Sequence, residues 1–192
     1  LVSPDILGAS QGAAFGAAVA ILLSVSSFAT SLFAFGFSLL TVLLVLLIST
    51  RARGNHMMVV VLAGVMVSSL FQAGVSYAKL VADPTDELAD ITYWLMGSLS
   101  AASFAALRLG APAILLSCVV LLLLRWKLNL LPLSDDEART FGTNIHRLRG
   151  LCIVCCAAMT ASCVAMCGQV GWVGLLVPHV CRMIFGSSHA RL

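Results

Sequence analysis

Cysteine thiols are the most reactive side chains in this sequence, and there are seven of them. Six lie in uncharged stretches, and the spacing Cys152-x2-Cys155 is half of a metal-binding or redox motif. The surrounding segment holds neither a histidine nor a second such pair. Because cysteine also packs as a small apolar residue inside lipid-embedded helices, we interpret these cysteines as packing residues. We predict no metal site, no disulfide and no cofactor.

Glycine and histidine near the end of the sequence are two further candidates for chemistry. The run Gly168-x2-Gly171-x2-Gly174 lacks the lysine of a phosphate-binding loop, and no Gly-x4-Gly-Lys-Ser/Thr motif occurs in the chain. It indicates a broken membrane helix instead. No nucleophile motif accompanies His179, which argues against an intramembrane hydrolase that pairs a serine with this histidine. We therefore predict no catalytic residue, and we assign any ATP hydrolysis to another subunit.

The overall composition indicates a protein embedded in a membrane. Of the 192 residues, 60% are hydrophobic and 10% are charged, and the mean hydropathy is +1.05. Soluble domains have about 45–50% apolar and about 25% charged residues, so this chain has too few charges to cover a water-soluble globule. The formal net charge is +3, and no basic run is interleaved with aromatic residues, which argues against nucleic-acid binding.

Charged residues divide the sequence into apolar stretches that predict helices crossing the bilayer. The uncharged stretch 6–50 is too long for one span of about 30 Å at about 1.5 Å per residue, so we expect a turn in the serine-rich segment 24–31. Lipid-embedded backbone must satisfy its own hydrogen bonds, so every span is helical. The predicted spans are residues 10–23, 32–49, 57–78, 109–124, 149–167 and a short broken segment, 173–185. We predict an all-α, polytopic transmembrane helical bundle that forms a single domain over residues 1–192.

Three glycines in the first span predict a close contact between helices. Gly8-x3-Gly12-x3-Gly16 places them on one helical face at i, i+4 spacing, which lets a neighbouring backbone approach. We interpret this face as a packing face and not as a ligand site.

Lysine and arginine are distributed unequally between the predicted loops, and this predicts an orientation. Residues 51–53, 125–149 and the tail after residue 181 hold all but two of the eleven Lys and Arg residues. The segment 79–108 holds the other two. It also contains four acids, which we interpret as a solvated face: Asp83, Asp86, Glu87 and Asp90. By the positive-inside rule the basic loops are cytoplasmic and the acidic segment is external. Alternation of the six segments places the basic loops on one side, so the two criteria agree.

The interiors of the predicted spans contain no Asp, Glu, Lys or Arg. Ion-coupled carriers usually need such groups within the membrane as relays. Only His56, Lys79 and His179 lie near segment ends. We therefore expect the energy for any transport to come from outside the membrane domain. The alternative is an ion-coupled secondary transporter of another fold, in which discontinuous helices such as 168–185 are common.

The basic segment 126–148 predicts two short cytoplasmic helices. Ser134 can cap a helix N-terminus, with Glu137 at the third position of a capping box, and the acids of this segment complement the positive end of the helix dipole. The first helix is expected at 135–141 and ends before Gly142. A second turn at 144–148 leads into the next span. Two such helices form a rigid knob that can receive force from a partner, and an idle surface loop is the alternative.

In combination, these motifs resemble those of the FecCD-like (BtuC-like) permease subunits of bacterial type II ABC importers for iron–siderophore, haem and cobalamin. The resemblance covers essentially the whole chain, with the motifs in the family's order and spacing. It rests on Pro4-Asp5-Ile6-Leu7-Gly8 with Ser10-x-Gly12-Ala13, Leu62-Ala63-Gly64, Asp83-Pro84, Trp94-Leu95-Met96-Gly97-Ser98-Leu99-Ser100, Leu133-Ser134-Asp135-Asp136-Glu137-Ala138-Arg139 with Gly142 and Asn144, Gly171-Trp172-Val173-Gly174-Leu175, Pro178-His179, Arg182, His189 and Arg191. Departures are modest: Ser134 stands at a usual Gly, Phe141 at a usual Leu and Ser188 at a usual Asp.

The resemblance implies a fold of ten helices, of which this chain covers helices three to eight as a fragment. It implies a transport subunit, not an enzyme, that imports an iron–siderophore or a related metal chelate such as haem or cobalamin. The implied partners are a second permease subunit in a homodimer or pseudo-dimer, cytoplasmic ATP-binding subunits and an external substrate-binding protein. The implied location is the lipid bilayer of the bacterial inner membrane.

The resemblance also implies roles for three groups of residues. Contact with the ATPase is implied for Leu133, Asp135, Asp136, Glu137, Ala138, Arg139, Phe141 and Gly142. The wall of the translocation pathway is implied for the span 57–78, in which Met66, Ser69 and Gln72 are candidates and packing against lipid or helices is the alternative. The signature at the short eighth helix matches Gly171, Gly174, Pro178, His179 and Arg182. For these residues, helix breaking and capping is the alternative to substrate contact, and Arg182 is expected to anchor the cytoplasmic interface.

Overall fold

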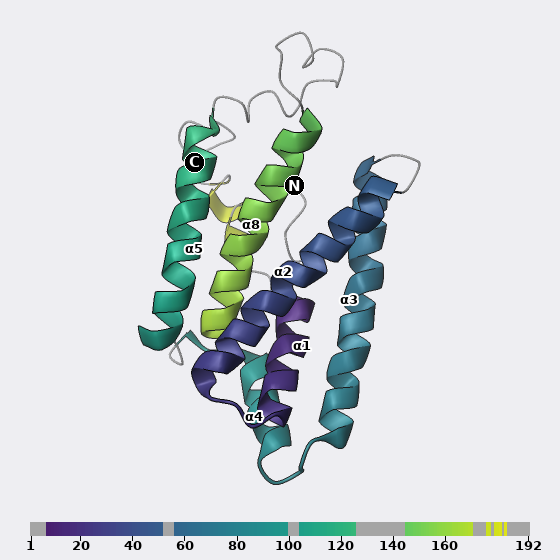
Figure 1. The fold of residues 1–192 in the computed structure, drawn as a ribbon, viewed down its shortest axis with the longest axis vertical. Coiled ribbons are helices and arrows are strands. Elements are labelled where there is room, and N and C mark those ends of the chain that lie inside the picture. Colours follow the sequence, from purple (N-terminus) through teal and green to yellow (C-terminus); the bar gives the residue numbers. More distant parts are fainter. Residues whose placement is uncertain are drawn as a thin grey trace.

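The computed structural model describes residues 7–51, 56–99, 104–125 and 145–170, together with 176–177, 179–181 and 183. All regular secondary structure in these residues is helical. The helices are α1 (Ala9–Leu22), α2 (Ser27–Arg51), α3 (His56–Val81), α4 (Glu87–Met96), α5 (Phe104–Leu123) and α8 (Ile145–Cys167). Figure 1 shows α2, α3, α5 and α8 running along the length of the bundle, with the short α4 at one end. The predicted all-α bundle is confirmed.

Four of the described helices are long and apolar enough to cross a bilayer. They lie within α2, α3, α5 and α8 and comprise Ser27–Arg51, Met58–Val81, Ala106–Leu123 and Leu148–Cys167. α1 has 14 residues. At about 1.5 Å per residue it is only about 21 Å long, less than the hydrocarbon thickness of about 30 Å. The six membrane crossings therefore stay a prediction.

α1 lies among the long helices and packs against α2, α3, α4 and α8. Its glycines face its neighbours, and a Cβ atom on Gly16 would lie 2.6 Å from the carbonyl oxygen of Phe33 in α2. A Cβ atom on Gly8 would lie 2.5 Å from Ser68 Oγ in α3. Only glycine allows backbones to approach this closely. The interpretation of Gly8-x3-Gly12-x3-Gly16 as a packing face is confirmed.

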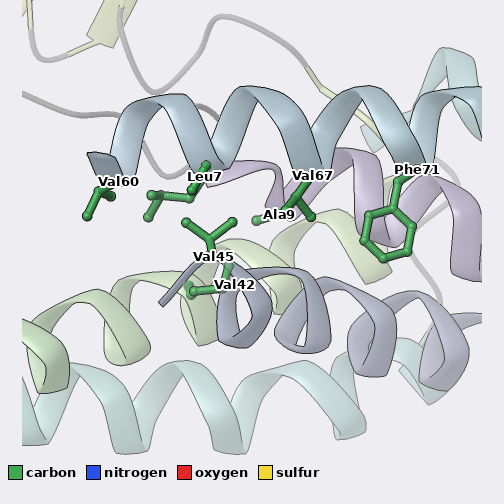
Figure 2. Close-up of a cluster of buried hydrophobic side chains, with 9 residues drawn as sticks. Leu7, Ala9, Val42, Val45, Val60, Val67 and Phe71 are labelled. Carbon is green, nitrogen blue, oxygen red and sulfur yellow. The ribbon is translucent and has the colours of Figure 1, made fainter. Parts of the chain in front are cut away.

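The largest buried apolar cluster of the described residues joins α1, α2 and α3 and includes Ala157 of α8. Figure 2 shows its main side chains, which project from the three helices toward one another. The cluster contains Leu7, Ala9, Val42, Val45, Val60, Ala63, Val67, Phe71 and Ala157. Phe15 adds edge-to-face and tilted ring contacts with Phe37 and Phe71, at centroid distances of 5.4 and 5.5 Å. Such pairs add about 0.5–1.5 kcal/mol each beyond the area they bury, so α1 is fixed between α2 and α3.

The turn between α1 and α2 is shorter than predicted. It comprises residues 23–26, and Ser24 adopts a left-handed conformation with φ of 51°. The prediction of a turn as far as residue 31 is wrong. The hydroxyls of Thr30 and Ser31 donate to the carbonyl oxygens of Ser26 and Ser27, both at 3.3 Å, and are therefore satisfied within a helix. α2 thus begins at Ser27 and not at Leu32.

α3, α5 and α8 extend beyond the boundaries that charged residues predicted. α3 continues past Lys79 to Val81, and α5 begins at Phe104, before Arg108. Lys and Arg side chains can reach the interface from within a helix, so a charge does not have to end one. α8 begins at Ile145 and runs without a break to Cys167, so the predicted separate turn at 144–148 is wrong for the described residues 145–148.

α4 is a helix that the sequence analysis did not predict. It lies in the acidic segment, and Glu87 and Asp90 occupy its first turn. Ile91 is 1% exposed and packs with Ala18, Ala78 and Ala82 of the neighbouring segments. The acidic segment is therefore a helix anchored to the bundle by an apolar face and not a solvated loop alone.

The charged ends of the described helices are arranged as alternation requires. Figure 1 shows the C-terminal ends of α2 and α5 and the N-terminal end of α8 together at one end of the bundle. Arg51 ends α2, and Arg125 closely follows α5. The link between α3 and α4, with Asp83 and Asp86, lies at the opposite end. Which end faces the cytoplasm stays a prediction.

Candidate functional site

The three candidate pathway residues lie on one exposed face of α3. Met66 is 72% exposed, and Ser69 and Gln72 are also exposed. Spacings of three residues place them on one side of a helix. The opposite side of α3 is buried and carries residues of the apolar cluster, including Val67 and Phe71. The structure thus places the three candidates on one face, and no other described part of the chain packs over that face.

This exposed face combines hydroxyl, amide and apolar groups. Ser69 Oγ donates to the carbonyl oxygen of Val65 at 2.9 Å, and Ser76 Oγ donates to that of Gln72 at 3.1 Å. Because each hydroxyl donates to its own helix, what it offers outward is an acceptor oxygen. Leu62 and Leu70, at 58% and 69% exposed, lie between and beside these groups. Such a surface can contact a large ligand over a wide area without holding it by strong polar bonds.

A cavity of about 810 Å³ lies at the acidic end of the bundle, between the ends of α1, α2, α4, α5 and α8. Hydroxyl groups line one side, from Ser24 in the turn between α1 and α2 to Ser27, Thr30 and Ser31 in α2. The other side carries carboxylates and aromatic rings of α4 together with the end of α8: Asp86, Glu87, Asp90, Tyr93, Trp94, Cys167 and Gly168. The cavity is therefore polar and electronegative on its α4 side.

Hydrogen bonds order the link between α3 and α4 that leads into this wall. The Thr85 hydroxyl and the Thr85 backbone N–H, the latter at 2.8 Å, donate to Asp83 Oδ1. These two bonds, the hydroxyl's first, hold the pKa of the Asp83 carboxyl below its usual range. The Asp83 N–H donates to Glu87 Oε2 at 3.0 Å. The Asp83 carboxylate, with its lowered pKa, therefore stays ionised at physiological pH and adds to the negative charge of this end.

Most of the other predicted site residues lie outside the described residues. All eight candidates for contact with an ATPase fall in the undescribed segment 126–144, namely Leu133, Asp135, Asp136, Glu137, Ala138, Arg139, Phe141 and Gly142. Gly171, Gly174, Pro178 and Arg182 are also outside the described residues, and His179 is helical and exposed. α8 begins directly after the segment 126–144.

The cysteines form no disulfide in the structure. Among the described residues, no group of three or more His, Cys, Asp or Glu side chains is arranged to hold a metal ion. The sulfur-containing residues of α8 are distributed along the helix: Cys152, Cys155, Cys156, Met159, Cys163, Met166 and Cys167.

Sequence reasoning missed the cavity, although part of its wall had a signal. Asp86, Glu87 and Asp90 precede and begin an amphipathic run in which Ile91, Trp94 and Leu95 recur at helical spacing, and Gly97 follows as a stop. This is the pattern of a short surface helix. The hydroxyl side of the cavity had no such signal, because α2 places it by tertiary packing.

Comparison with known proteins gives the same family that the sequence motifs resemble, and it does so along the full sequence. The FecCD transport family matches residues 1–192. The molybdate import system permease MolB of Haemophilus influenzae is 38% identical over 100% of this chain and 57% of its own length. A probable iron chelatin transport system permease of Helicobacter pylori is 38% identical over 100% of this chain and 58% of its own length.

A solved structure of a metal-chelate type ABC transporter, in an inward-facing conformation, has the same fold. It is 36% identical and superposes with a TM-score of 0.90 over 100% of this chain and 61% of that chain. This chain therefore spans about three fifths of the length of the relatives that it matches. Since the family match extends from the first residue to the last, the chain belongs to the FecCD transport family.

Proposed function

We propose that this chain forms the central part of a membrane permease subunit that imports a metal chelate with energy from a separate ATPase. The observation that carries the proposal is the superposition, at a TM-score of 0.90 and 36% identity, on a metal-chelate type ABC transporter. The described helices support it, because their charged residues lie near helix ends: Lys79 in α3, Arg108 in α5 and Arg149 in α8. The middle of these helices has no Asp, Glu, His, Lys or Arg that an ion relay could use.

The proposed assembly has two permease subunits, two cytoplasmic ATP-binding subunits and one external substrate-binding protein. The basic end of the bundle, with Arg51 and Arg125, faces the cytoplasm in the bacterial inner membrane. The segment 126–144 then meets the ATPase, and the acidic cavity faces outward. The residues Gly171, Gly174 and Pro178 break and cap a short membrane helix, and Arg182 anchors its cytoplasmic side.

The cargo is a bulky metal chelate, such as an iron–siderophore, haem or cobalamin. The two curated relatives named above differ in cargo, molybdate in one and iron chelatin in the other, so the family alone leaves the chelate open. The exposed face of α3 suits a large cargo that must enter and leave. It offers acceptor oxygens and apolar contacts, including Met66, and no charged group on the stretch 66–76.

The energy source is the decisive test of the proposal. The full-length permease is reconstituted in proteoliposomes with its ATPase and binding protein, and uptake of a ferric siderophore, haem, cobalamin and molybdate is measured. We expect uptake of at least one of these cargoes to require ATP on the side of the segment 126–144 and to continue when an ionophore abolishes the proton gradient. Uptake that collapses with the ionophore and continues without ATP would instead establish an ion-coupled secondary transporter.

Bulk added to the exposed face of α3 tests the proposed pathway. Replacing Ser69 by tryptophan is expected to reduce uptake by about tenfold or more, because it places a large ring where the cargo must pass. The matched control is Leu47→Trp on α2, which is 48% exposed at a position outside the proposed pathway. It is expected to retain uptake within about twofold, since exposed substitutions change stability by only about 0.5 kcal/mol. Equal uptake by the two variants would place Ser69 outside the pathway.

A further inference from the structure

Four cysteines of α8 form two pairs in which the members are four residues apart. The pairs are Cys152 with Cys156 and Cys163 with Cys167. On an α-helix, residues four apart lie one above the other on the same face, with their Cβ atoms about 5–6 Å apart. Within each pair the two thiols are close enough to act on each other electrostatically. Each pair therefore presents two sulfur atoms side by side.

The two pairs lie on the same side of α8. Corresponding members are eleven residues apart, which is about three turns and about 16 Å along the helix axis. α8 keeps this spacing because it runs unbroken over its 23 residues and contains no proline. Met159 lies on this side between the pairs. We call the side defined by Cys152, Cys156, Met159, Cys163 and Cys167 the sulfur face of α8.

The sulfur face is not the packing side of α8. Ala157 and Ala165 belong to apolar clusters with α1 and α2, and Ala161 between them is 0% exposed. These alanines recur every four residues and lie on the other side of the helix. Cys156 and Cys163, in contrast, are exposed. The thiols of the sulfur face are therefore not needed to fill the contact of α8 with α1 and α2.

All four cysteines of the pairs carry free thiols. Cys152 and Cys167 are partly buried, and their partners in each pair are exposed. Both members of a pair belong to one helix, so their spacing does not depend on which segments lie beside α8 in a longer protein. Each pair is therefore a preformed dithiol.

A dithiol without further ligands suits a soft metal ion. Calcium and magnesium prefer several oxygen ligands, and structural zinc sites have four ligands. No group of three or more His, Cys, Asp or Glu side chains in the described part of the chain is arranged to hold a metal. Thiolate sulfur selects soft ions, and among these the mercuric ion is bound in a line between two sulfur atoms.

The surroundings of α8 favour a divalent ion over a monovalent one. A divalent ion that binds a dithiol replaces both thiol protons: two S–H bonds break, two sulfur–metal bonds form, two protons leave, and the complex is neutral. A monovalent ion held by the same two thiolates would leave one negative charge in the candidate membrane span Leu148–Cys167. An uncompensated charge within a bilayer is costly. The dithiols therefore suit a soft divalent ion.

We propose that the two dithiols, Cys152 with Cys156 and Cys163 with Cys167, are binding sites for a soft divalent metal ion in linear two-sulfur coordination. Each dithiol takes one ion. The inference is independent of the proposed transport function, because binding requires only that α8 is folded. The second dithiol is the cleaner one to test, since it has no other cysteine within one turn of α8, whereas Cys155 adjoins the first dithiol.

Mercury retained by the purified full-length permease tests the proposal. The protein is treated with mercuric chloride and washed with micromolar glutathione, and the bound mercury per chain is measured by elemental analysis. Glutathione removes mercury that is held by a single cysteine. In a dithiol, the second thiol acts at an effective concentration of about millimolar and rebinds the ion, so this mercury is retained. X-ray absorption at the mercury edge is expected to show two sulfur neighbours for each retained ion.

Single replacements in α8 distinguish a dithiol from separate thiols. Cys163→Ala breaks the second dithiol and is expected to retain one mercuric ion per chain fewer than the unaltered protein. Cys167→Ala breaks the same dithiol from its other member and is expected to show the same loss. Cys155→Ala is the matched control, because it removes one thiol from the same helix and leaves both dithiols intact. It is expected to retain as much mercury as the unaltered protein.

Three results would overturn the proposal. Equal losses in Cys163→Ala and Cys155→Ala would mean that mercury reports single thiols and not pairs. Undiminished retention in both Cys163→Ala and Cys167→Ala would mean that this dithiol does not hold the ion. A single sulfur neighbour in the absorption spectrum would place each ion on one cysteine. None of these results bears on the proposed transport function, which is tested by the energy source of uptake.

Discussion

Replacing Gly12 by alanine will lower the free energy of unfolding by about 1–3 kcal/mol, the usual effect of extra volume in a well-packed interior. The added Cβ atom would coincide with the side chain of Thr41 and lie 2.7 Å from the carbonyl oxygen of Phe37, so α1 and α2 must separate. Because α2, α3, α4 and α8 all pack on α1, moving α1 away from α2 also disturbs its packing against the other three helices. Thermal unfolding of the purified full-length permease measures the effect, at about 2–4 °C per kcal/mol for a domain of about 150–250 residues.

Gly36→Ala is the matched control for this change. Gly36 lies in α2, is exposed, and has no atom within 4 Å of the position that a Cβ atom would occupy. Alanine restricts the unfolded chain and favours a helix by about 0.5–1 kcal/mol over glycine, so this variant is expected to be slightly more stable. The same Gly→Ala change is thus expected to lower the free energy of unfolding at Gly12 and to raise it slightly at Gly36. Similar melting temperatures for the two variants would mean that α1 and α2 do not pack as closely as described.

The long helices could be predicted from the sequence because burial in lipid demands long apolar stretches. Charged residues located α3 and α8 to within a few residues of the boundaries in the structure. The errors arose where a charge or a hydroxyl is compatible with a helix. Thr30 and Ser31 satisfy their hydroxyls on carbonyl oxygens four residues back, so a serine-rich stretch that predicts a turn is the first part of α2.

α4 was missed for a different physical reason. It has only one fully buried large side chain, Ile91, and its acids lie at its N-terminal end, where the helix dipole favours them. A search for long apolar stretches does not detect a helix as short as α4. The helical spacing of its apolar residues would have indicated it. The pattern of Glu87, Asp90, Ile91, Trp94 and Gly97 contains both the helix and its end.

The cavity and the contact between the C-terminal ends of α4 and α8 could not be predicted from local patterns. A Cβ atom on Gly168 would lie 2.8 Å from the Cα atom of Gly97, although the two glycines are far apart in the sequence and each alone is simply a helix stop. Their contact depends on how α4 and α8 meet in space. The same holds for the candidate pathway residues, because periodicity places Met66, Ser69 and Gln72 on one face but does not say which face of α3 is buried. Val67 and Phe71 settle this through contacts with α1 and α2.

Replacing both Glu137 and Arg139 by alanine in the full-length permease is expected to reduce cargo-stimulated ATP hydrolysis by about tenfold or more. The reason is that these charged side chains, proposed to contact the ATPase, would leave their partners buried and unpaired. Truncating one member of a buried charge pair at a protein interface costs about 2–5 kcal/mol, and each 1.4 kcal/mol is about tenfold. Hydrolysis is measured with and without cargo and binding protein, on complexes that still copurify with the ATPase.

Lys127→Ala provides the control for this pair, because Lys127 lies in the same basic segment but outside the matched motif of residues 133–144. A charge outside the proposed contact contributes little to it, so cargo-stimulated hydrolysis should stay within about twofold of the unaltered protein. The comparison also separates docking from transmission. If the Glu137 and Arg139 variant no longer copurifies with the ATPase, the residues hold the ATPase in place; if it copurifies but does not respond to cargo, they transmit its movement. Unchanged stimulation in an intact complex would remove both residues from the coupling contact and direct attention to the acids at 135 and 136.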